Sequence, residues 1–596
     1  MPILPAYLAP LPQRLRSLFV MMSLLVVTPW LVTGCGDRAD DVPAPPVPAE
    51  AGVATPAVAM EEGAAQELAL PSLKAVTLSA EAHSVPVSFE LANGLRGWAV
   101  QLEGNHALAT PCVVDGRVYI GGGFGSYDFY CLDAATGEQI WRVRTTDDGP
   151  TAAVVVGEYV CFNTESCTLE VRLTSTGELV WGRWLGDPLM SQPAATEEYV
   201  VVCFPRGGGP VPNQQLQMNS NVAPPINNQN AATPGTEDAP SDAAATAESQ
   251  QAPPVEANLN TQRKTAEAPE AHHKPVPRGK VVHGHPPVEG EGTHALACYA
   301  LATGELRWIQ SVPADCITAP VIDDGVVYAA TFDGTVTTLD LESGELLGKE
   351  QQNATSAPWV IAAADAPRGK LALVSQRDSQ EIAGERHHWE SLRRLDISAN
   401  ATEAREQRRL APHLHEATIS TSRYYSEEFK AAQDAGVGFA QAPVQANTGA
   451  ANRNVGESRI AALWAFEGSR PLVDDDGHLI TTLGNQVSLA SLDGTVEWSQ
   501  VYRPAVKERL LTPPAAVGQQ LVYASLDGHV FTLERATGKV RHAARFDKRL
   551  VYQPAVVDGV IFVGSLDGWV IALDTDEQSL DGWSMWGGGP RHNGVE

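Results

Sequence analysis

Positive charge is scarce in this sequence, and several catalytic signatures are missing from it. The 596 residues include 42 Lys and Arg against 71 Asp and Glu, which gives a formal net charge of −29. This acidic excess disfavours nonspecific attraction to nucleic acid or to an anionic membrane surface. The sequence has no glycine-rich phosphate loop, no nucleophile elbow, no Ser-His-Asp set and no zinc-type Cys or His spacing. It therefore predicts no catalytic residue, no metal ligand and no nucleic-acid partner.

A hydrophobic run long enough to span a bilayer is also missing near the N-terminus. Arg14 and Arg16 precede an apolar stretch, residues 18–27, that is too short to cross a hydrocarbon core of about 30 Å. The following Val-Thr-Gly-Cys of residues 32–35 resembles the bacterial lipobox. We therefore predict a lipoprotein signal peptide over residues 1–34 and lipidation of Cys35. A chance cysteine after an ordinary signal peptide is the alternative.

The residues after Cys35 predict where the protein lies and how it is spaced from the membrane. By the same resemblance, Gly36 in place of an Asp favours release towards the outer membrane. We therefore expect a lipid-anchored protein of the cell envelope that faces the periplasm. Residues 35–85 are rich in Ala, Pro and Glu. Because such a segment buries too little apolar surface to offset chain entropy, we predict a flexible tether.

A repeat of about 40 residues runs through residues 86–596. In each copy, short runs of Val, Ile, Tyr and Phe are separated by Asp-Gly pairs, such as Asp527-Gly528 and Asp567-Gly568. The apolar runs are typical of strands, and Asp-Gly supplies the positive φ that a tight hairpin turn demands. A second glycine, such as Gly137, precedes a fourth strand. Four short strands per copy are typical of one blade of a β-propeller.

The repeat predicts the fold class: all-β, an eight-bladed β-propeller of four-stranded antiparallel blades. The blades start near Pro111, Ala152, Pro193, Pro320, Pro358, Pro471, Pro514 and Pro554. The eighth copy lacks a clean fourth strand, and residues 95–100 read as an orphan fourth strand, so we predict that this N-terminal strand closes the ring. Trp583 marks a competing strand. Two tracts without strand pattern, residues 205–293 and 398–458, are predicted insertions, and the first is predicted to be disordered.

Tryptophan recurs at one position of the repeat. Trp141, Trp181, Trp308 and Trp498 each lie four residues after the second glycine of their copy, and Trp98 lies in the predicted closing strand. Packing between neighbouring blades explains a fixed Trp position, since each blade must bury both faces. The alternative is an aromatic platform for a ligand. We predict that all five are structural blade-docking residues.

The strings around these tryptophans resemble a known family. Leu-Asp-Ala-Ala-Thr-Gly-Glu at residues 132–138, followed by Trp141, resembles the tryptophan-docking motif of pyrroloquinoline quinone (PQQ) repeat proteins, as do residues 173–181 and 299–308. Residues 583–594 resemble a segment common in that superfamily. The resemblance implies a quinoprotein-type β-propeller and two functional classes. One holds PQQ-dependent alcohol and sugar dehydrogenases with quinone and calcium at the axis, and the other holds noncatalytic lipoproteins of the outer-membrane assembly factor BamB family.

Residues that would mark the dehydrogenase class are not recognisable. The resemblance implies a disulfide between adjacent cysteines against the quinone, and this chain has no Cys-Cys pair. Calcium ligands and a catalytic Asp have no counterpart that we can assign. We therefore expect no cofactor and no cofactor-binding residue, PQQ and calcium being implied by the fold resemblance alone. Asp527 and Asp567 precede glycine, which is typical of turns.

Seven cysteines besides Cys35 leave the disulfide pairing open. Cys161 with Cys167, and Cys203 with Cys298, are candidate pairs in an oxidising compartment, and buried thiols within strands are the alternative. Histidine pairs at residues 272–273 and 387–388 lie in or near polar tracts, where solvated side chains are expected rather than a metal site.

These observations favour a noncatalytic, membrane-anchored β-propeller scaffold that binds a protein or another envelope component, with outer-membrane protein assembly as one setting. Two alternatives stay open: a PQQ-dependent oxidoreductase with a degenerate cofactor site, and a sensor module for a small molecule or glycan. The fold does not separate them, because function depends on the loops and the central funnel that a propeller presents.

Overall fold

The computed structural model describes only part of the chain. The described residues are 66–123, 125–150, 152–164, 168–186, 192–206, 273–314, 316, 319–331, 334–351, 359–362, 370–382, 385–394, 416–421, 472–473, 478–483, 486–491, 496–502 and 511–593. They lie in one compact unit, Val58–Glu596. Every regular element among them is a β-strand, and this part of the chain contains no helix long and apolar enough to cross a membrane.

The strands form eight sheets, four of which come from the first half of the unit. Sheet 1 holds β4 (Cys112–Val114), β5 (Arg117–Gly121), β6 (Asp128–Asp133) and β7 (Gln139–Arg144). Sheet 2 holds β8 (Val154–Val156), β9 (Tyr159–Asn163), β10 (Thr168–Leu173), β11 (Leu179–Trp184) and β14 (Lys280–His283). Sheet 3 holds β12 (Ala194–Ala195), β13 (Tyr199–Pro205), β15 (His294–Ala300) and β16 (Leu306–Val312). Sheet 4 holds β17 (Val321–Asp323), β18 (Val326–Ala330), β19 (Thr335–Asp340) and β20 (Leu346–Gln351).

The other four sheets draw on the second half of the unit and on its N-terminal strands. Sheet 5 holds β21 (Trp359–Ala362), β22 (Lys370–Ile382), β23 (Glu385–Arg394) and β24 (Glu416–Thr421). Sheet 6 holds β25 (Leu472–Val473), β26 (His478–Leu483), β27 (Gln486–Ser491), β28 (Val496–Val501) and β1 (Gln66–Glu67). Sheet 7 holds β29 (Ala515–Val517), β30 (Gln520–Ala524), β31 (His529–Glu534) and β32 (Val540–Arg545). Sheet 8 holds β33 (Ala555–Val557), β34 (Val560–Gly564), β35 (Trp569–Asp574), β3 (Arg96–Gln101) and β2 (Val87–Glu90).

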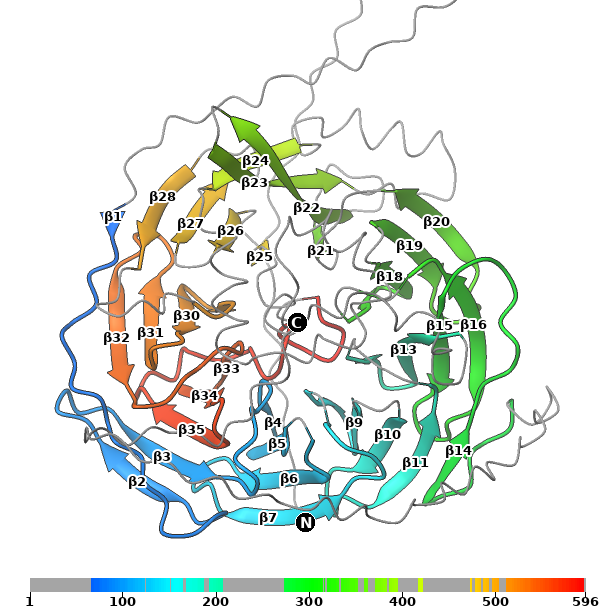
Figure 1. Cartoon of the computed structure of the whole chain (residues 1–596), viewed down its shortest axis with the longest axis horizontal. Helices are drawn as coiled ribbons and strands as arrows, with labels where there is room; N and C mark the ends of the chain where they lie inside the picture. The colour runs from blue at the N-terminus through cyan, green and yellow to red at the C-terminus, as the bar shows by residue number, and fades with distance from the viewer. Residues whose placement is uncertain are drawn as a thin grey trace, which may run out of the picture. The chain divides into compact units, whose positions relative to one another are not determined.

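The order of the sheets follows the repeat. Each first strand begins one or two residues after the start predicted from the sequence. The all-β fold is confirmed, and each sheet has four antiparallel strands, to which sheets 2, 6 and 8 add a fifth. Contacts join the first strands β33 with β4, β4 with β8, β8 with β12, β12 with β17, β21 with β25 and β29 with β33. Figure 1 shows the sheets of this unit following one another around a centre, with their first strands innermost.

The hairpin turns depend on the Asp-Gly pairs that the repeat supplies. Asp558 and Gly559, between β33 and β34, both have positive φ, +50° and +81°. Two consecutive positive φ angles give the turn whose twist matches that of antiparallel strands. Between the second and third strands of sheet 7, Gly528 has φ +89° and Ser525 Oγ donates to Asp527 Oδ1 at 2.7 Å. These turns set the short spacing between strands on which the repeat rests.

The tether predicted over residues 35–85 is wrong for its last twenty residues. β1 pairs in parallel with β28, and Val76 N donates to Arg545 O at 2.8 Å. Leu68 and Leu78 are buried in the core that includes sheets 6, 7 and 8. The prediction rested on the average composition of residues 35–85 and did not consider these two leucines. Their burial offsets the entropy lost when the segment becomes ordered. Residues 35–65 lie outside the described residues.

The disordered insertion predicted over residues 205–293 is wrong for residues 273–293. β14 pairs in parallel with β11, and Arg206 Nη1 donates to Gly290 O at 2.6 Å. The Lys-Val-Val-His sequence of β14 has strand propensity, but the strand is too short for the repeat pattern to reveal. Likewise, β24, the fourth strand of sheet 5, lies inside the insertion predicted over residues 398–458. The other residues of both tracts fall largely outside the described residues.

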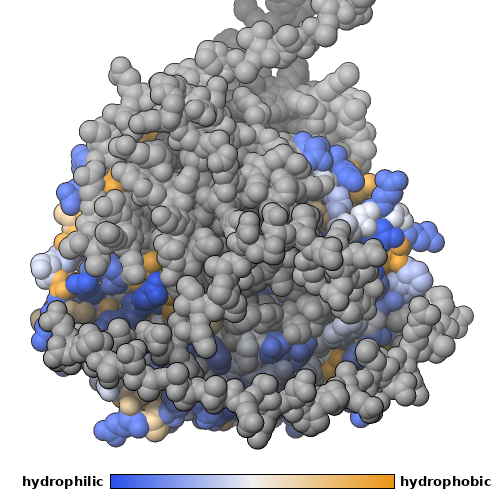
Figure 2. Space-filling model, in the orientation of Figure 1, coloured by the Kyte–Doolittle hydropathy of each residue, from blue (hydrophilic) through white to orange (hydrophobic). Residues whose placement is uncertain are grey.

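The exposed surface of the described residues offers few large hydrophobic side chains. Four large hydrophobic residues of this part of the chain are exposed, and they come from separate segments: Val85, Tyr127, Ile140 and Leu346. On the face drawn in Figure 2, hydrophobic residues of the described part are scattered among hydrophilic ones. Scattered single residues of this kind are ordinary on soluble surfaces.

Candidate functional site: seams between sheets and the inner edge

The five tryptophans predicted as docking residues lie at five different seams, where a seam is the interface between two neighbouring sheets. They occupy β3, β7, β11, β16 and β28. Each indole N–H donates to a backbone carbonyl oxygen of the next sheet: Trp98 to Ala134 at 3.0 Å, Trp141 to Thr174 at 3.0 Å, Trp181 to Leu301 at 2.7 Å, Trp308 to Leu341 at 2.7 Å, and Trp498 to Arg535 at 2.8 Å. A buried indole N–H needs such an acceptor.

Each tryptophan also covers a glycine in the next sheet. A Cβ on any of these glycines would lie within 3.2 Å of the indole: Gly137 under Trp98, Gly177 under Trp141, Gly304 under Trp181, Gly344 under Trp308, and Gly538 under Trp498. The φ angles of these glycines lie between +67° and +75°. Glycine is therefore required twice, by the backbone conformation and by the ring above it. The sequence offered part of this signal, since three of these glycines, Gly137, Gly177 and Gly304, are those from which Trp positions are counted.

The seam between sheets 7 and 8 departs from this pattern. His542, four residues after Gly538, stands where five other sheets have Trp, and its Nε2 lies 2.8 Å from Glu577 Oε2. Gln520 Nε2 donates to the other oxygen of that carboxylate at 2.9 Å. Burial raises the pKa of Glu577, but hydrogen bonds from His542, Gln520 and Ser579 outweigh it and lower the pKa to about 2. Here a polar contact replaces the indole.

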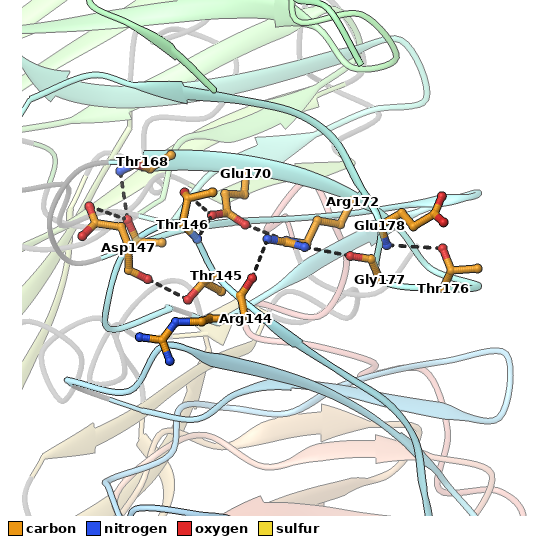
Figure 3. Close-up of polar contacts among 11 residues, drawn as sticks. Arg144, Thr145, Thr146, Asp147, Thr168, Glu170, Arg172, Thr176, Gly177 and Glu178 are labelled. Carbon is orange, nitrogen blue, oxygen red and sulfur yellow. Dashed lines mark hydrogen bonds and ion pairs between the residues drawn. The ribbon is translucent and has the colours of Figure 1, made fainter. Parts of the chain in front are cut away.

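The seam between sheets 1 and 2 contains a buried ion pair that the sequence analysis missed. Glu170 and Arg172 lie two residues apart on β10 and therefore on one face of the strand. Arg172 Nε lies 2.6 Å from Glu170 Oε2, and the two side chains are 5% and 0% exposed, respectively. Figure 3 shows the pair lying between groups from both sheets. The available signal was two opposite charges within an otherwise apolar strand, Thr-Leu-Glu-Val-Arg-Leu.

Hydrogen bonds with groups of both sheets satisfy this ion pair. Thr146 donates to Glu170 Oε1 through both its backbone N, at 2.7 Å, and its hydroxyl group. Arg172 Nη2 donates to Arg144 O at 3.1 Å, and its Nη1 donates to Gly177 O at 2.8 Å. Because desolvating two charges is costly, a buried pair is stable only when its remaining lone pairs and protons are bonded. The pair therefore ties β10 to the chain that leaves β7.

A second polar cluster spans sheets 6 and 7. Tyr502 Oη donates to Asp527 Oδ1 at 2.7 Å and lies 2.8 Å from His529 Nδ1. Burial raises the pKa of Asp527, but hydrogen bonds from His529, Ser525 and Tyr502 lower it by more. Burial and the adjacent carboxylate raise the pKa of Tyr502. Asp527 thus does more than shape its turn, because it also anchors a side chain of the preceding sheet.

The inner edges of five sheets are bonded to residues 583–593. The N–H of the second residue of each first strand donates to this segment: Val113 to Ser584 O at 2.7 Å, Ala195 to Pro590 O at 2.9 Å, Ile322 to Arg591 O at 3.0 Å, Val360 to Asn593 Oδ1 at 2.9 Å, and Val556 to Trp583 O at 2.7 Å. Trp583, the competing closing strand of the sequence analysis, therefore pairs with β33, while Trp98 lies on β3, which pairs with β35. The segment lies at the centre in Figure 1, where the chain end is marked.

The cysteines of the described residues are buried. Cys112, Cys131, Cys161 and Cys298 are free thiols. Burial raises the pKa of Cys161 to about 12 and that of Cys131 to about 12. The candidate pairs Cys161 with Cys167 and Cys203 with Cys298 are therefore not disulfides, because one member of each is a free thiol. Cys35 lies outside the described residues.

Clusters of metal-binding side chains are absent from the described part of the chain. It contains no group of three or more His, Cys, Asp or Glu side chains arranged to hold a metal ion. At the inner edge, the five N–H groups that face the centre are already bonded to residues 583–593. These N–H groups are therefore not available to another ligand while residues 583–593 are in place.

Comparisons with known proteins point to one family. The family described as "Outer membrane protein assembly factor BamB" matches residues 82–211, 248–411 and 461–586, more than half of the chain. An outer membrane protein assembly factor BamB of Yersinia pestis is 28% identical over 102 residues, which are 15% of this chain and 24% of that protein. The chain thus aligns with about a quarter of that relative's length.

Two solved structures are among those that the chain matches. BamB from Moraxella catarrhalis is 12% identical with a TM-score of 0.30, and the match covers 82% of this chain and 98% of that one. Saccharomyces cerevisiae Sqt1 is 8% identical with a TM-score of 0.46, and the match covers 85% of this chain and 100% of that one.

Proposed function

This chain belongs to the family described as outer membrane protein assembly factor BamB, and from that premise we propose that it is a noncatalytic β-propeller scaffold of the cell envelope. Its role is to bind another envelope protein in the course of outer-membrane protein assembly. The observation that carries the proposal is the use of the repeated tryptophans. All five lie in seams, where the indole N–H donates to the next sheet. The family motif therefore stabilises the fold, and the loops remain available to bind a partner protein.

The proposal includes the completion of the ring. We infer that the eight sheets are the blades of one propeller and that β3 closes it as the fourth strand of the last blade. The register of β3 against β35, from Arg96 opposite Asp574 to Gln101 opposite Trp569, supports this. So does Trp98, which reaches from sheet 8 to Ala134 in sheet 1. In a closed ring every blade packs between two neighbours, and only short strand edges stay exposed.

Attachment to the membrane is part of the same proposal. Lipidation of Cys35, followed by sorting to the outer membrane, would hold the scaffold at the periplasmic face. Replacing Cys35 with Ser tests this directly, because the variant should leave the detergent phase or accumulate unprocessed. Unchanged detergent partitioning with normal maturation would contradict the anchor while leaving the scaffold proposal in place.

The assembly role is tested in cells that lack this protein. We expect the amount of folded outer-membrane β-barrel proteins to fall, while the amount of other outer-membrane lipoproteins stays constant. A photo-crosslinking residue at Ile140 or Leu346, both exposed on outer strands, should capture a component that assembles outer-membrane proteins. Unchanged β-barrel levels would contradict the proposal.

The oxidoreductase alternative has its own test. Purified protein mixed with PQQ and Ca²⁺ should show neither tight quinone binding by calorimetry nor dye-linked oxidation of alcohols or sugars. The occupied inner edge supports this expectation, because a quinone at that position would have to displace residues 583–593. Stoichiometric quinone uptake with turnover would overturn the noncatalytic assignment.

A further inference from the structure

Residues 583–593 contact the sheets in the way that a bound peptide contacts its receptor. The segment belongs to no sheet: its pairings are isolated bridges, Val556 with Trp583 and Met585 with Gly588. Oxygen atoms of the segment accept hydrogen bonds from N–H groups at the inner edges of five sheets. These N–H groups occupy equivalent positions in the five first strands. A strand edge leaves such donors unpaired, and an added peptide satisfies them.

Three side chains give these contacts a specific register. Met585, 1% exposed, packs in the core cluster of sheets 1, 2 and 3. His592 places its two ring nitrogens 2.9 Å from Trp586 O and 2.9 Å from Pro193 O. Asn593 pairs with Val360 in both directions, since its Oδ1 accepts from Val360 N and its Nδ2 donates to Val360 O at 3.1 Å. The carboxamide of Asn593 thus replaces a backbone amide of a neighbouring strand.

The backbone of the segment is shaped by two glycines and a short connection. Gly587 and Gly588 have φ +77° and +96°, which turn the chain between the contacts with sheet 1 and those with sheet 3. Gly587 N donates to Gln553 Oε1 at 2.9 Å. The connection from β35 passes through Gln578 and Ser579, which are exposed. A cut there would sever no strand of any sheet.

We propose that the inner edges of sheets 1, 3, 4, 5 and 8 form a peptide-binding site, and that residues 583–593 are its resident ligand, held in cis. The site recognises a turn-containing peptide that presents four backbone carbonyl oxygens and one Asn carboxamide, which pairs with Val360, to five N–H groups. This inference goes beyond the scaffold function and does not rest on it. Its consequence is that the same peptide, supplied in trans, exchanges with the resident segment.

The experiment uses the full chain and cuts it after folding. A recognition sequence for a specific protease is inserted between Gln578 and Ser579, and the folded protein is cleaved there. Fluorescent peptides covering residues 579–596 are then added, and binding is followed by anisotropy and by the melting temperature of the cleaved protein. The test peptide carries Asn593→Leu. The control peptide carries Ser584→Ala, because Ser584 reaches sheet 1 through its backbone oxygen rather than its side chain.

We expect the cleaved protein to retain its own segment, to exchange it for the labelled native peptide, and to bind the Ser584→Ala peptide equally well. The Asn593→Leu peptide should bind at least about tenfold more weakly, since it loses both bonds to Val360. Excess native peptide should raise the melting temperature of the cleaved protein.

Three results would overturn the proposal. One is departure of the segment with no change in melting temperature. Another is a segment that never exchanges below the melting transition, as expected of an integral part of the core. The third is equal binding of the native and Asn593→Leu peptides.

Discussion

The seam between sheets 2 and 3 and the seam between sheets 7 and 8 place different chemistry at one position of the repeat. Trp181 is fully buried, covers Gly304 and donates to Leu301 O. His542 stands at the same place and meets Glu577, with both side chains 21% exposed. The geometry of the repeat therefore fixes where a side chain must cross the seam but not what it is. The contact made by an indole is insensitive to pH and salt, whereas the contact between an imidazole and a carboxylate responds to both.

We expect the largest difference between the two seams when Trp181 and His542 are each replaced with Ala. Trp181→Ala should lower the free energy of unfolding by about 3–5 kcal/mol, because it opens a cavity beside Gly304 and leaves the Leu301 carbonyl oxygen without its donor. His542→Ala should cost only about 1 kcal/mol, since its contact with Glu577 is partly solvated. Urea denaturation of both variants at one pH measures the difference. Equal losses would show that the two seams do not differ in the way proposed.

Substitutions at two glycines separate the effect of the indole contact from that of backbone strain. Gly304 and Gly116 have nearly the same φ, +67° and +69°. A Cβ on Gly304 would meet Trp181 Cδ2 at 2.7 Å, whereas a Cβ on Gly116 would have no neighbour within 4 Å. Gly304→Ala should therefore cost about 2 kcal/mol more than Gly116→Ala, which carries only the backbone strain. Thermal unfolding of the two variants provides the measurement, and equal melting temperatures would argue against a tight indole contact.

The smallest expected effect is a pH dependence confined to the polar seam. Because the pKa of Glu577 is lowered from 4.5 to about 2 by its partners in the folded protein, this carboxylate stabilises the fold above about pH 4.5. That stability is lost as the pH falls towards 2. Glu577→Gln should therefore flatten the decline in unfolding free energy between pH 4.5 and pH 2 by about 1 kcal/mol. Trp181→Ala serves as the control and should keep the wild-type pH dependence, so a parallel flattening in it would contradict the assignment.

The repeat made most of the fold predictable. Strand starts, turn positions and the five seam tryptophans all follow from local pattern, because hairpin turns and blade packing impose the same requirements on every copy. The short edge strands β1 and β14 could not be predicted in this way. Each pairs in parallel with a distant strand, and two to four residues give no periodic signal.

The polar contacts between sheets were predictable only in part. Glu170 and Arg172 were visible as charges in an apolar strand, but their partners, Thr146 and Arg144, come from the neighbouring sheet. The same holds for His542, whose position was countable from Gly538 while Glu577 was not. The family resemblance identified residues 583–593 as a common segment but did not predict its hydrogen bonds. The N–H groups that it binds come from five sheets, which the sequence does not bring together.

The pairing of β3 with β35 determines when this protein can finish folding. Arg96 and Asp574 are neighbours in sheet 8 although 478 positions separate them along the chain. Most other strand pairs join neighbours in sequence, so the four antiparallel strands of each other sheet can pair without either end of the unit, while sheet 8 waits for both ends. Closing so long a loop has a high entropic cost and is slow, which places it among the last folding steps. Until then β3 and β35 each expose an unpaired edge, and the chain is most prone to aggregation during that interval.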